Sequence, residues 1–294
     1  MSVATVIRPK ARDLGDFVVR RSLPALHRQM VGPFIFFDHM GPADFPPGAG
    51  IDVRPHPHIN LATVTYLFDG ELFHRDSTGA AQNIEPGAVN WMTAGSGIVH
   101  SERSSPLSRA RHMHIEGIQS WVALPVTHEQ VPPSFVHYPA ATLPQWQQGQ
   151  WECRLIAGRA FGKTSPVETL SPLFYVDCHA QRADTLDIDC PYTERAVYVA
   201  RGEICIDGST YSTGDFLVLE PDTKVRIEAH STSRVMLLGG EAFAERRYIW
   251  WNFVSSSQRR LEDAKQRWRD GHFPPVAGEH EFIPLPDPPA RKTP

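Results

Sequence analysis

The stretch from Arg54 to Arg103 places the strongest constraint on the fold of this chain. It begins with His56-Pro57-His58 and ends with His100-Ser101-Glu102, and turn dipeptides such as Asp69-Gly70 and Pro86-Gly87 separate short apolar runs between them. Side chains two residues apart on a strand point to the same face. If the outer strands are antiparallel neighbours, three imidazoles and one carboxylate converge, which predicts a divalent transition-metal site.

Short apolar runs bounded by turn residues recur along the whole chain. The 294 residues include 21 glycines and 26 prolines, which are spread between the runs. This pattern is typical of a β sandwich or small barrel and predicts an all-β protein. Residues 41–50 and 139–150 are predicted to be loops. The expected strands are 17–19, 34–39, 60–68, 71–75, 88–93, 115–124, 153–157, 173–178, 196–200, 203–206, 216–220, 225–229 and 235–238.

A weak internal repeat divides the chain into two halves. The spacing of Tyr66, Gly70 and Glu71 recurs at residues 198, 202 and 203. We therefore expect one barrel with the metal site over residues 1–140 and a related barrel over 141–294. When the two halves are aligned, the positions of the four candidate ligands are taken by residues that do not form such a ligand set. The second barrel is therefore expected to bind no metal at these positions. These residues are Ile188, Cys190, Ile227 and Ala229.

One helix is predicted over residues 258–269. Ser255 to Ser257 offer an N-cap, and Ser255 with Gln258 fits a capping box. Apolar spacing within the run is helical, and Gly271 provides the stop signal. The tail over 273–294 is proline-rich and is expected to form an irregular arm.

Composition and charge exclude several function classes. The formal net charge of -4 gives no reason to expect nucleic acid or an anionic membrane as the main partner. The chain has neither an apolar signal-peptide core near its start nor a run of membrane-spanning length, so a cytoplasmic location is expected. Four cysteines without CxxC spacing predict free thiols rather than disulfides.

The predicted metal ligands are His56, His58, His100 and Glu102. Imidazole and carboxylate donors suit iron, copper, nickel, manganese, cobalt or zinc, and the absence of cysteine ligands argues against a closed structural zinc site. Four protein ligands leave room for water, substrate or dioxygen on a metal that takes five or six. The other histidines are expected to be structural, with His112 and His114 kept as a weaker alternative pair and His39 expected near the site.

The motif residues as a group resemble the pirin family of the cupin superfamily. The resemblance rests on the His56 pair, on residues 63–66 and 74–77, and above all on the run from Trp91 to Glu102. Segments at 31–39, 119–125 and 251–255 are similar to the family too. It implies two cupin barrels packed face to face with a metal, usually iron, in the first one only. The implied ligands are the same four residues.

The sequence departs from the family pattern directly after the first histidine pair. Family members usually continue with Arg-Gly-Phe-Glu, whereas this chain has Ile59-Asn60-Leu61-Ala62. The acid common at position 62 is therefore missing. Partners of metal ligands orient the imidazoles and tune the metal, so this change is expected to affect the surroundings of the site and the substrate range.

The resemblance implies a quercetin 2,3-dioxygenase-type enzyme that opens a flavonol-like ring with dioxygen. Glu102 would serve as a metal ligand and as the general base, and Fe(II) is the expected metal. An alternative stays open: a non-enzymatic metal-binding regulatory or redox-sensing module that acts through protein partners, as eukaryotic pirins are described as transcription cofactors. Sugar-phosphate isomerisation is a third and weaker alternative, because the fold alone does not choose between them.

Overall fold

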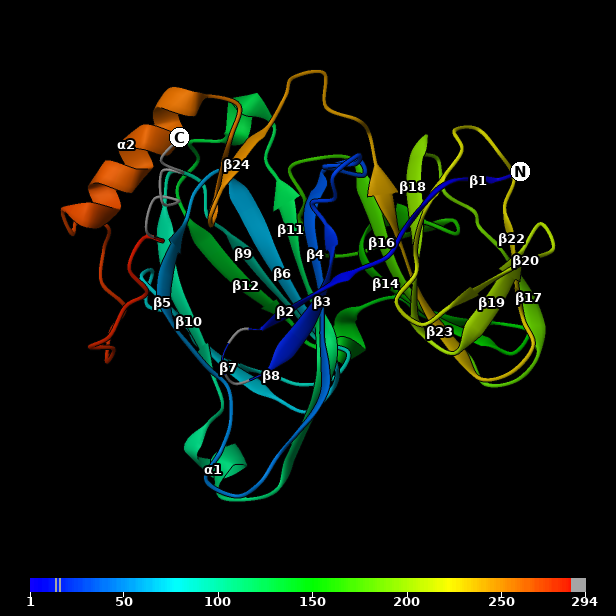
Figure 1. Ribbon diagram of the computed structural model, residues 1–294, viewed down its shortest axis with the longest axis horizontal. Helices are drawn as coiled ribbons and strands as arrows, with labels where there is room; N and C mark the ends of the chain where they lie inside the picture. The colour runs from blue at the N-terminus through cyan, green and yellow to red at the C-terminus, as the bar shows by residue number, and fades with distance from the viewer. Residues whose placement is uncertain (14, 16, 287–294) are drawn as a thin grey trace, which may run out of the picture.

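The computed structural model describes residues 1–13, 15 and 17–286. It confirms the all-β prediction: two sets of strands lie side by side, and helix α2 (Gln258–Arg269) lies at the outer edge of the first set (Figure 1). The other helical segments described are α1 (Pro106–Arg109) and the 3-10 turns η1 (Val126–His128) and η2 (Ala140–Thr142). None of the described helices has the length and apolar character needed to cross a membrane.

The first half consists of a large and a small sheet. The large sheet has the strand order β12-β9-β6-β11-β4-β3-β2, and the small one has the order β5-β10-β7-β8. The strands of the large sheet are β2 (Lys10–Asp13), β3 (Val18–Leu23), β4 (Phe34–Phe45), β6 (Leu61–Asp69), β9 (Val89–Thr93), β11 (Met113–Ala123) and β12 (Ser134–Tyr138). Those of the small sheet are β5 (Asp52–His58), β7 (Leu72–Asp76), β8 (Ala81–Ile84) and β10 (Ile98–Arg103).

The second half repeats this plan. Its large sheet follows the order β1-β21-β18-β23-β16-β14-β13, with β15 paired to β14, and its small sheet follows β17-β22-β19-β20. The large sheet contains β1 (Val3–Ile7), β13 (Gln145–Gln148), β14 (Trp151–Ala160), β15 (Lys163–Thr164), β16 (Leu173–Ala180), β18 (Glu194–Arg201), β21 (Phe216–Leu219) and β23 (Ser233–Gly240). The remaining strands are β17 (Asp184–Asp187), β19 (Glu203–Ile206), β20 (Ser209–Ser212), β22 (Arg226–Ala229), and the hairpin of β24 (Tyr248–Trp250) and β25 (Phe253–Ser255).

The predicted closed barrels are not formed, because each half is built from separate sheets. The chain passes from the small sheet to the large one between β5 and β6, where Asn60 adopts a left-handed backbone with φ of 59°. Such a residue interrupts the strand, and short polar side chains tolerate it best.

Two predicted loops are partly wrong for local reasons. Strand β4 continues through the Gly41-Pro42 pair to Phe45, because a register shift against β11 accommodates these residues within the ladder. Residues 145–148, within the predicted linker, form the edge strand β13 along β14. The remaining predicted strands match observed ones within a few residues.

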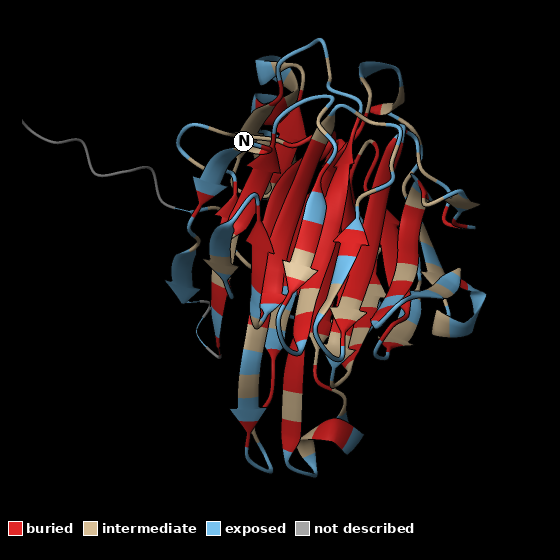
Figure 2. Cartoon of the chain, turned by 90° about the vertical axis from the view of Figure 1, so that its right-hand side faces the viewer, coloured by how far each residue is buried: buried red, intermediate tan, exposed pale blue. Residues whose placement is uncertain are grey.

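The large sheets of the two halves pack against each other through a continuous apolar core. Figure 2 shows the broad, mostly buried strands of this region. Phe34 of the first half meets Tyr175 of the second edge to face, with ring centroids 5.2 Å apart, and Phe37 meets Tyr198 at 4.9 Å. Edge-to-face ring contacts add to the hydrophobic stabilisation from burial. The predicted face-to-face packing of the two halves is therefore confirmed.

The two ends of the chain cross over to the opposite half. Strand β1 extends the large sheet of the second half by pairing with β21 (Figure 1). At the other end, β25 and α2 cover the first half, where Phe253 and Leu261 pack against Ile59 and Val99. Each half is thus completed by a segment distant in sequence.

The predicted helix α2 has the predicted bounds, but its predicted capping box is wrong. The N-cap is Ser257, which makes no side-chain capping bond. The Ser255 and Ser256 hydroxyls instead donate to the Glu129 carboxylate, at 3.2 and 2.9 Å. Part of the predicted arm, residues 287–294, lies outside the described residues.

Glu129 anchors this C-terminal cover through a buried charge network. Its side chain is fully buried and also accepts the Ser256 backbone N–H at 2.6 Å. The guanidinium groups of Arg247 and Arg260 balance its charge, and that of Arg247 is equally buried. Because the network is buried, removal of one charged side chain leaves its partner without water and without that countercharge.

We expect Glu129→Ala to lower the free energy of unfolding by about 3 kcal/mol, because it leaves the buried Arg247 with only the exposed Glu245 carboxylate, 3.9 Å away, as a countercharge. The matched control is Glu262→Ala, which removes a carboxylate from an exposed pair with Lys265 and is expected to cost less than about 1 kcal/mol. Urea unfolding of both variants provides the measurement. Equal effects at the two positions would contradict the anchoring role of Glu129.

Candidate metal centre

The strands β5 and β10 bring the two predicted ligand pairs together. They are antiparallel, with His56 opposite His100 and His58 opposite Ile98. A register shift follows His100, so that Glu102 lies opposite Val53. The predicted antiparallel pairing of the two motifs is thus confirmed.

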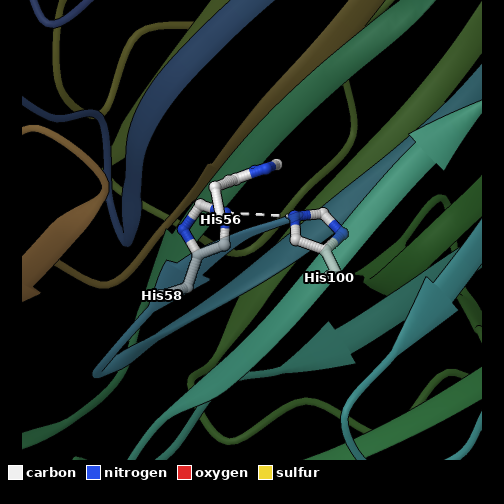
Figure 3. A group of neighbouring side chains, drawn as sticks. All are labelled: His56, His58 and His100. Atoms are coloured by element: carbon white, nitrogen blue, oxygen red, sulfur yellow. Dashed lines mark hydrogen bonds between the residues drawn. The ribbon is translucent and has the colours of Figure 1, made fainter. Parts of the chain in front are cut away.

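Three imidazoles from these strands meet at one point (Figure 3). The Nε2 atoms of His58 and His100 lie 3.1 Å apart, and the ring centroids of His56 and His100 lie 4.4 Å apart. One nitrogen from each ring lies within 4.8 Å of the others, and all three rings are buried. This geometry fits three donors to a shared divalent metal.

Glu102 belongs to an adjoining group that shares His100. Its carboxylate, His100 and His74 form a second set of possible ligand atoms within 4.8 Å of one another. The Thr65 hydroxyl donates to Glu102 Oε1 at 2.9 Å, which fixes the carboxylate from the large sheet. The structure therefore places the fourth predicted ligand next to the imidazole cluster.

His74 was predicted to be structural, but it contacts this centre. Strand β7 pairs with β10 so that His74 lies opposite Glu102 and Asp76 lies opposite His100. Its ring stacks on Phe135 with centroids 4.3 Å apart. The i, i+2 pair His74 and Asp76 beside a turn was the sequence signal for this role.

Hydrogen bonds engage the Nδ1 atoms of the three imidazoles, whereas the Nε2 atoms of His58 and His100 lie within hydrogen-bonding distance of each other. The Nδ1–H groups of His56 and His58 donate to the carbonyl oxygens of Arg54 and Asn252, at 2.9 and 3.0 Å. His74 Nε2–H donates to Asp76 at 2.9 Å, and His74 Nδ1 lies 3.5 Å from His100 Nδ1. Such partners fix the tautomer and orientation of metal-binding histidines.

Burial keeps the imidazoles neutral, as metal binding requires. Loss of hydration lowers the pKa of His56 from 6.5 to about 4 and lowers the pKa values of His58 and His100 as well. Burial raises the pKa of Glu102, although the neighbouring His74 and the Thr65 hydrogen bond oppose this. Neutral rings beside a carboxylate of raised pKa combine ligands with a candidate proton acceptor.

Residue 62 lies away from the imidazole cluster, in the core between the two halves. The alternation of side chains along the chain from His56 is interrupted at Asn60, so Ala62 and Tyr66 face the second half rather than the interior of the first. Ala62 is fully buried in the core between the halves. Backbone carbonyls orient His56 and His58, and the carboxylate of Asp76 holds His74, so none of these partners is supplied by residue 62.

The other histidines remain outside the centre. The His39 ring faces the second half, where it lies 2.8 Å from the Tyr198 hydroxyl and 3.3 Å from the Glu116 carboxylate. His114 lies 3.1 Å from Asp44 at the surface, and His112 is exposed. Neither His112 nor His114 joins a group of three possible ligands among the described residues.

A cavity of about 550 Å³ opens onto the predicted ligands. The Phe36 and Trp121 rings stack on its wall with centroids 4.0 Å apart, and the His58 and Trp121 rings meet edge to face with centroids 5.1 Å apart. The Arg21 guanidinium lies 4.3 Å from the centre of the Phe36 ring and forms two hydrogen bonds with Asp38, at 2.9 and 2.8 Å. An aromatic wall therefore leads from the imidazoles to an ion pair.

The corresponding positions of the second half carry apolar side chains. Ile227 and Ala229 are buried in the core of that half, and Ile188 and Cys190 pack against it. The fold and site together define a cupin-type protein of two related halves with one imidazole cluster.

Comparison with known proteins identifies the family within this class. The Pirin family matches residues 16–122, and the Pirin C-terminal cupin domain matches residues 175–274. A pirin-like protein of Caulobacter vibrioides is 49% identical over 286 residues, which is 96% of this chain and 99% of the relative. The chain belongs to the pirin family.

Two further relatives carry enzyme names. A Pseudomonas aeruginosa protein, provisionally named quercetin 2,3-dioxygenase, is 38% identical over 87% of this chain and 80% of its own. The crystal structure of quercetin 2,3-dioxygenase from Acinetobacter baumannii superposes with a TM-score of 0.90 at 32% identity, and covers 98% of this chain and 97% of that one. The predicted bicupin architecture is confirmed by this similarity.

The stability of the metal-free protein is expected to fall on acidification from pH 6.5 towards pH 4. In this window the unfolded chain binds protons at residues 56, 58 and 100, whereas their lowered pKa values keep the native rings neutral. The loss is about 1.4 kcal/mol per pH unit for each ring that stays neutral. Urea unfolding of protein treated with a chelator, across this pH range, measures this loss of stability.

The matched variants are His56→Gln and His112→Gln. The first removes one buried imidazole and should make the pH dependence shallower, whereas the second changes an exposed ring and should leave it unaltered. An unchanged slope in His56→Gln would show that this ring does not resist protonation.

Proposed function

We propose that the protein is a metal-dependent dioxygenase that cleaves a flavonol-like aromatic substrate in the manner of quercetin 2,3-dioxygenases. The observation that carries this proposal is the position of three imidazoles and Glu102 on the wall of a cavity with aromatic lining. The enzyme names of the two relatives support the same chemistry.

The proposed metal ligands are His56, His58, His100 and Glu102. These nitrogen and oxygen donors fit Fe(II) as the first choice, and also copper, nickel, manganese, cobalt or zinc. When bound, such a metal supplies Lewis-acid stabilisation of an anionic substrate oxygen and an open position for small ligands.

In this proposal Glu102 removes the proton of the substrate hydroxyl. The carboxylate is buried, and its raised pKa brings it closer to neutral pH, where a general base works best. The hydrogen bond from Thr65 holds one oxygen in place and leaves the other free for the substrate.

The aromatic wall selects a flat substrate. Phe36 and Trp121 offer apolar ring surface beside His58, and such surface binds planar rings and excludes water. Beyond this aromatic surface, Arg21 can donate to a phenolic or carbonyl oxygen of the substrate, while Asp38 accepts from a substrate hydroxyl. A polyhydroxylated aromatic such as a flavonol presents these groups.

The test of the proposed function is aerobic consumption of quercetin by metal-loaded protein and its Glu102→Gln variant. We expect the variant to retain part of its metal through the histidines and to lose at least about 100-fold in kcat, as befits a lost general base. Metal content by elemental analysis accompanies each rate measurement.

The Thr65→Val variant is the intermediate control, because it removes only the hydrogen bond to Glu102. A smaller loss of kcat is expected there. Unchanged turnover in Glu102→Gln would rule out Glu102 as the base. Absence of turnover with every metal in the unaltered protein would favour the regulatory module that acts through protein partners.

The Arg21→Lys substitution is expected to raise KM for quercetin about tenfold with little change in kcat. Lysine keeps the charge but loses the paired hydrogen bonds to Asp38 and the flat contact with Phe36. The matched control is Arg20→Lys on the opposite face of β3, where the side chain contacts His39 instead of the cavity. Equal KM values in the two variants would contradict a role of Arg21 in substrate binding.

A further inference from the structure

The second half carries a cluster of metal-binding side chains that the proposed function does not use. Cys205, Glu228 and His230 place a thiol sulfur, a carboxylate oxygen and an imidazole nitrogen within 4.8 Å of one another. The cluster lies on the small sheet, on strands β19 and β22 and at the end of β22. It is distinct from the imidazole centre of the first half.

Strand geometry explains the convergence. Cys205 is the direct cross-strand partner of Glu228, and His230 follows Glu228 by two residues, so it continues on the same face. Their neighbours Ile227 and Ala229 alternate to the other face and are buried in the core. The three donors therefore face outward.

The two halves place donors on opposite faces of one equivalent strand, β10 in the first half and β22 in the second. The alignment that places Ile227 and Ala229 against His100 and Glu102 also places the outward Ser101 and Arg103 of β10 against Glu228 and His230. A shift by one residue along a strand moves a donor from the inner to the outer face. The second half thus has its donors on the solvent side.

The outward face of the first half is occupied by the C-terminal segment. Ser101 and Arg103 donate to the carboxylate of Glu279, at 2.8 Å for the hydroxyl and for one guanidinium nitrogen. On the second half, Glu228 is half-buried and His230 is exposed. The cluster is therefore accessible from solvent.

In the part of the chain that the structure describes, no hydrogen bond or close ion pair competes for the donors of the cluster. Neither the Glu228 carboxylate nor the His230 ring makes a side-chain hydrogen bond or a close ion pair there, Glu228 has only a longer-range attraction to Arg226, and Cys205 is a free thiol. The nearest basic side chain on the same strand, Arg226, is bound to Asp187 at 2.7 Å. The three donor atoms are thus free to bind a cation.

We propose that Cys205, Glu228 and His230 form a second metal site, for a thiophilic divalent cation such as Zn²⁺. Thiolate, imidazole and carboxylate are the donors that zinc takes, and three protein ligands leave a fourth tetrahedral position for water. Binding releases the thiol proton to solvent, so the affinity increases with pH.

Cobalt(II) is the probe, because thiolate coordination gives it a charge-transfer band that histidine and carboxylate ligands do not give. The full-length protein, kept reduced, is titrated with cobalt(II) and observed in the near ultraviolet. We expect a thiolate band in the unaltered protein and its loss in Cys205→Ser. The first-half centre contributes none, since its described ligand groups contain no cysteine.

Two kinds of variant sharpen the assignment. Cys190→Ser removes a partly buried thiol outside the cluster and should leave the band intact. Glu228→Gln and His230→Ala should each weaken cobalt binding at this site at least 10-fold, the lower bound for losing even an outer partner of a ligand. Circular dichroism verifies that each variant is folded.

A separate measurement covers the case in which Cys205→Ser does not fold. In the unaltered protein, zinc should slow the alkylation of Cys205, as measured by peptide mass spectrometry. Any of three results would overturn the proposal: no thiolate band in the unaltered protein, a band that survives Cys205→Ser or disappears in Cys190→Ser, or alkylation of Cys205 at the same rate with and without zinc.

Discussion

The antiparallel register of β5 and β10 is the constraint on which the candidate centre depends. It sets His56 opposite His100, and the shift after His100 brings Glu102 beside the imidazoles. A slip by one residue would turn each of these side chains to the opposite face. The ladder from β10 to β7 adds His74 and Asp76 on the other side, so both neighbours of β10 contribute to the centre.

Burial of the imidazoles in this ladder costs hydration, and neighbouring carbonyls offset part of the cost. The carbonyl of Asn252 reaches His58 from the C-terminal segment, which Glu129 anchors to the first half. The orientation of a first-half ligand thus depends on residues near the far end of the chain. The packing of the two halves contributes in the same way, because the large sheet that supplies Thr65 and Trp121 is supported from behind by the aromatic core.

The two halves show how one strand plan can present different chemistry. In the first half the donors face inward, towards a cavity with aromatic walls, and the pKa values of the rings are lowered by burial. In the second half the inward positions are apolar, and the donors at residues 205, 228 and 230 lie on the outer face, where Cys205 is buried and His230 is exposed. The alternation of side chains along a strand makes this exchange possible without a change of fold.

The sequence by itself determined the all-β class, the repeat of two halves, most strand positions, helix α2 and the four candidate ligands, because these depend on local periodicity and on spacing within single strands. The features that depend on long-range contacts were decided by the tertiary structure. The left-handed Asn60 sets which face of β6 meets the site, and pairing with β10 brings His74 into it. Strand β1 joined the distant half, and Ser255 and Ser256 bound Glu129 instead of capping the helix. Contacts between residues far apart in the chain leave no periodic signal in the sequence.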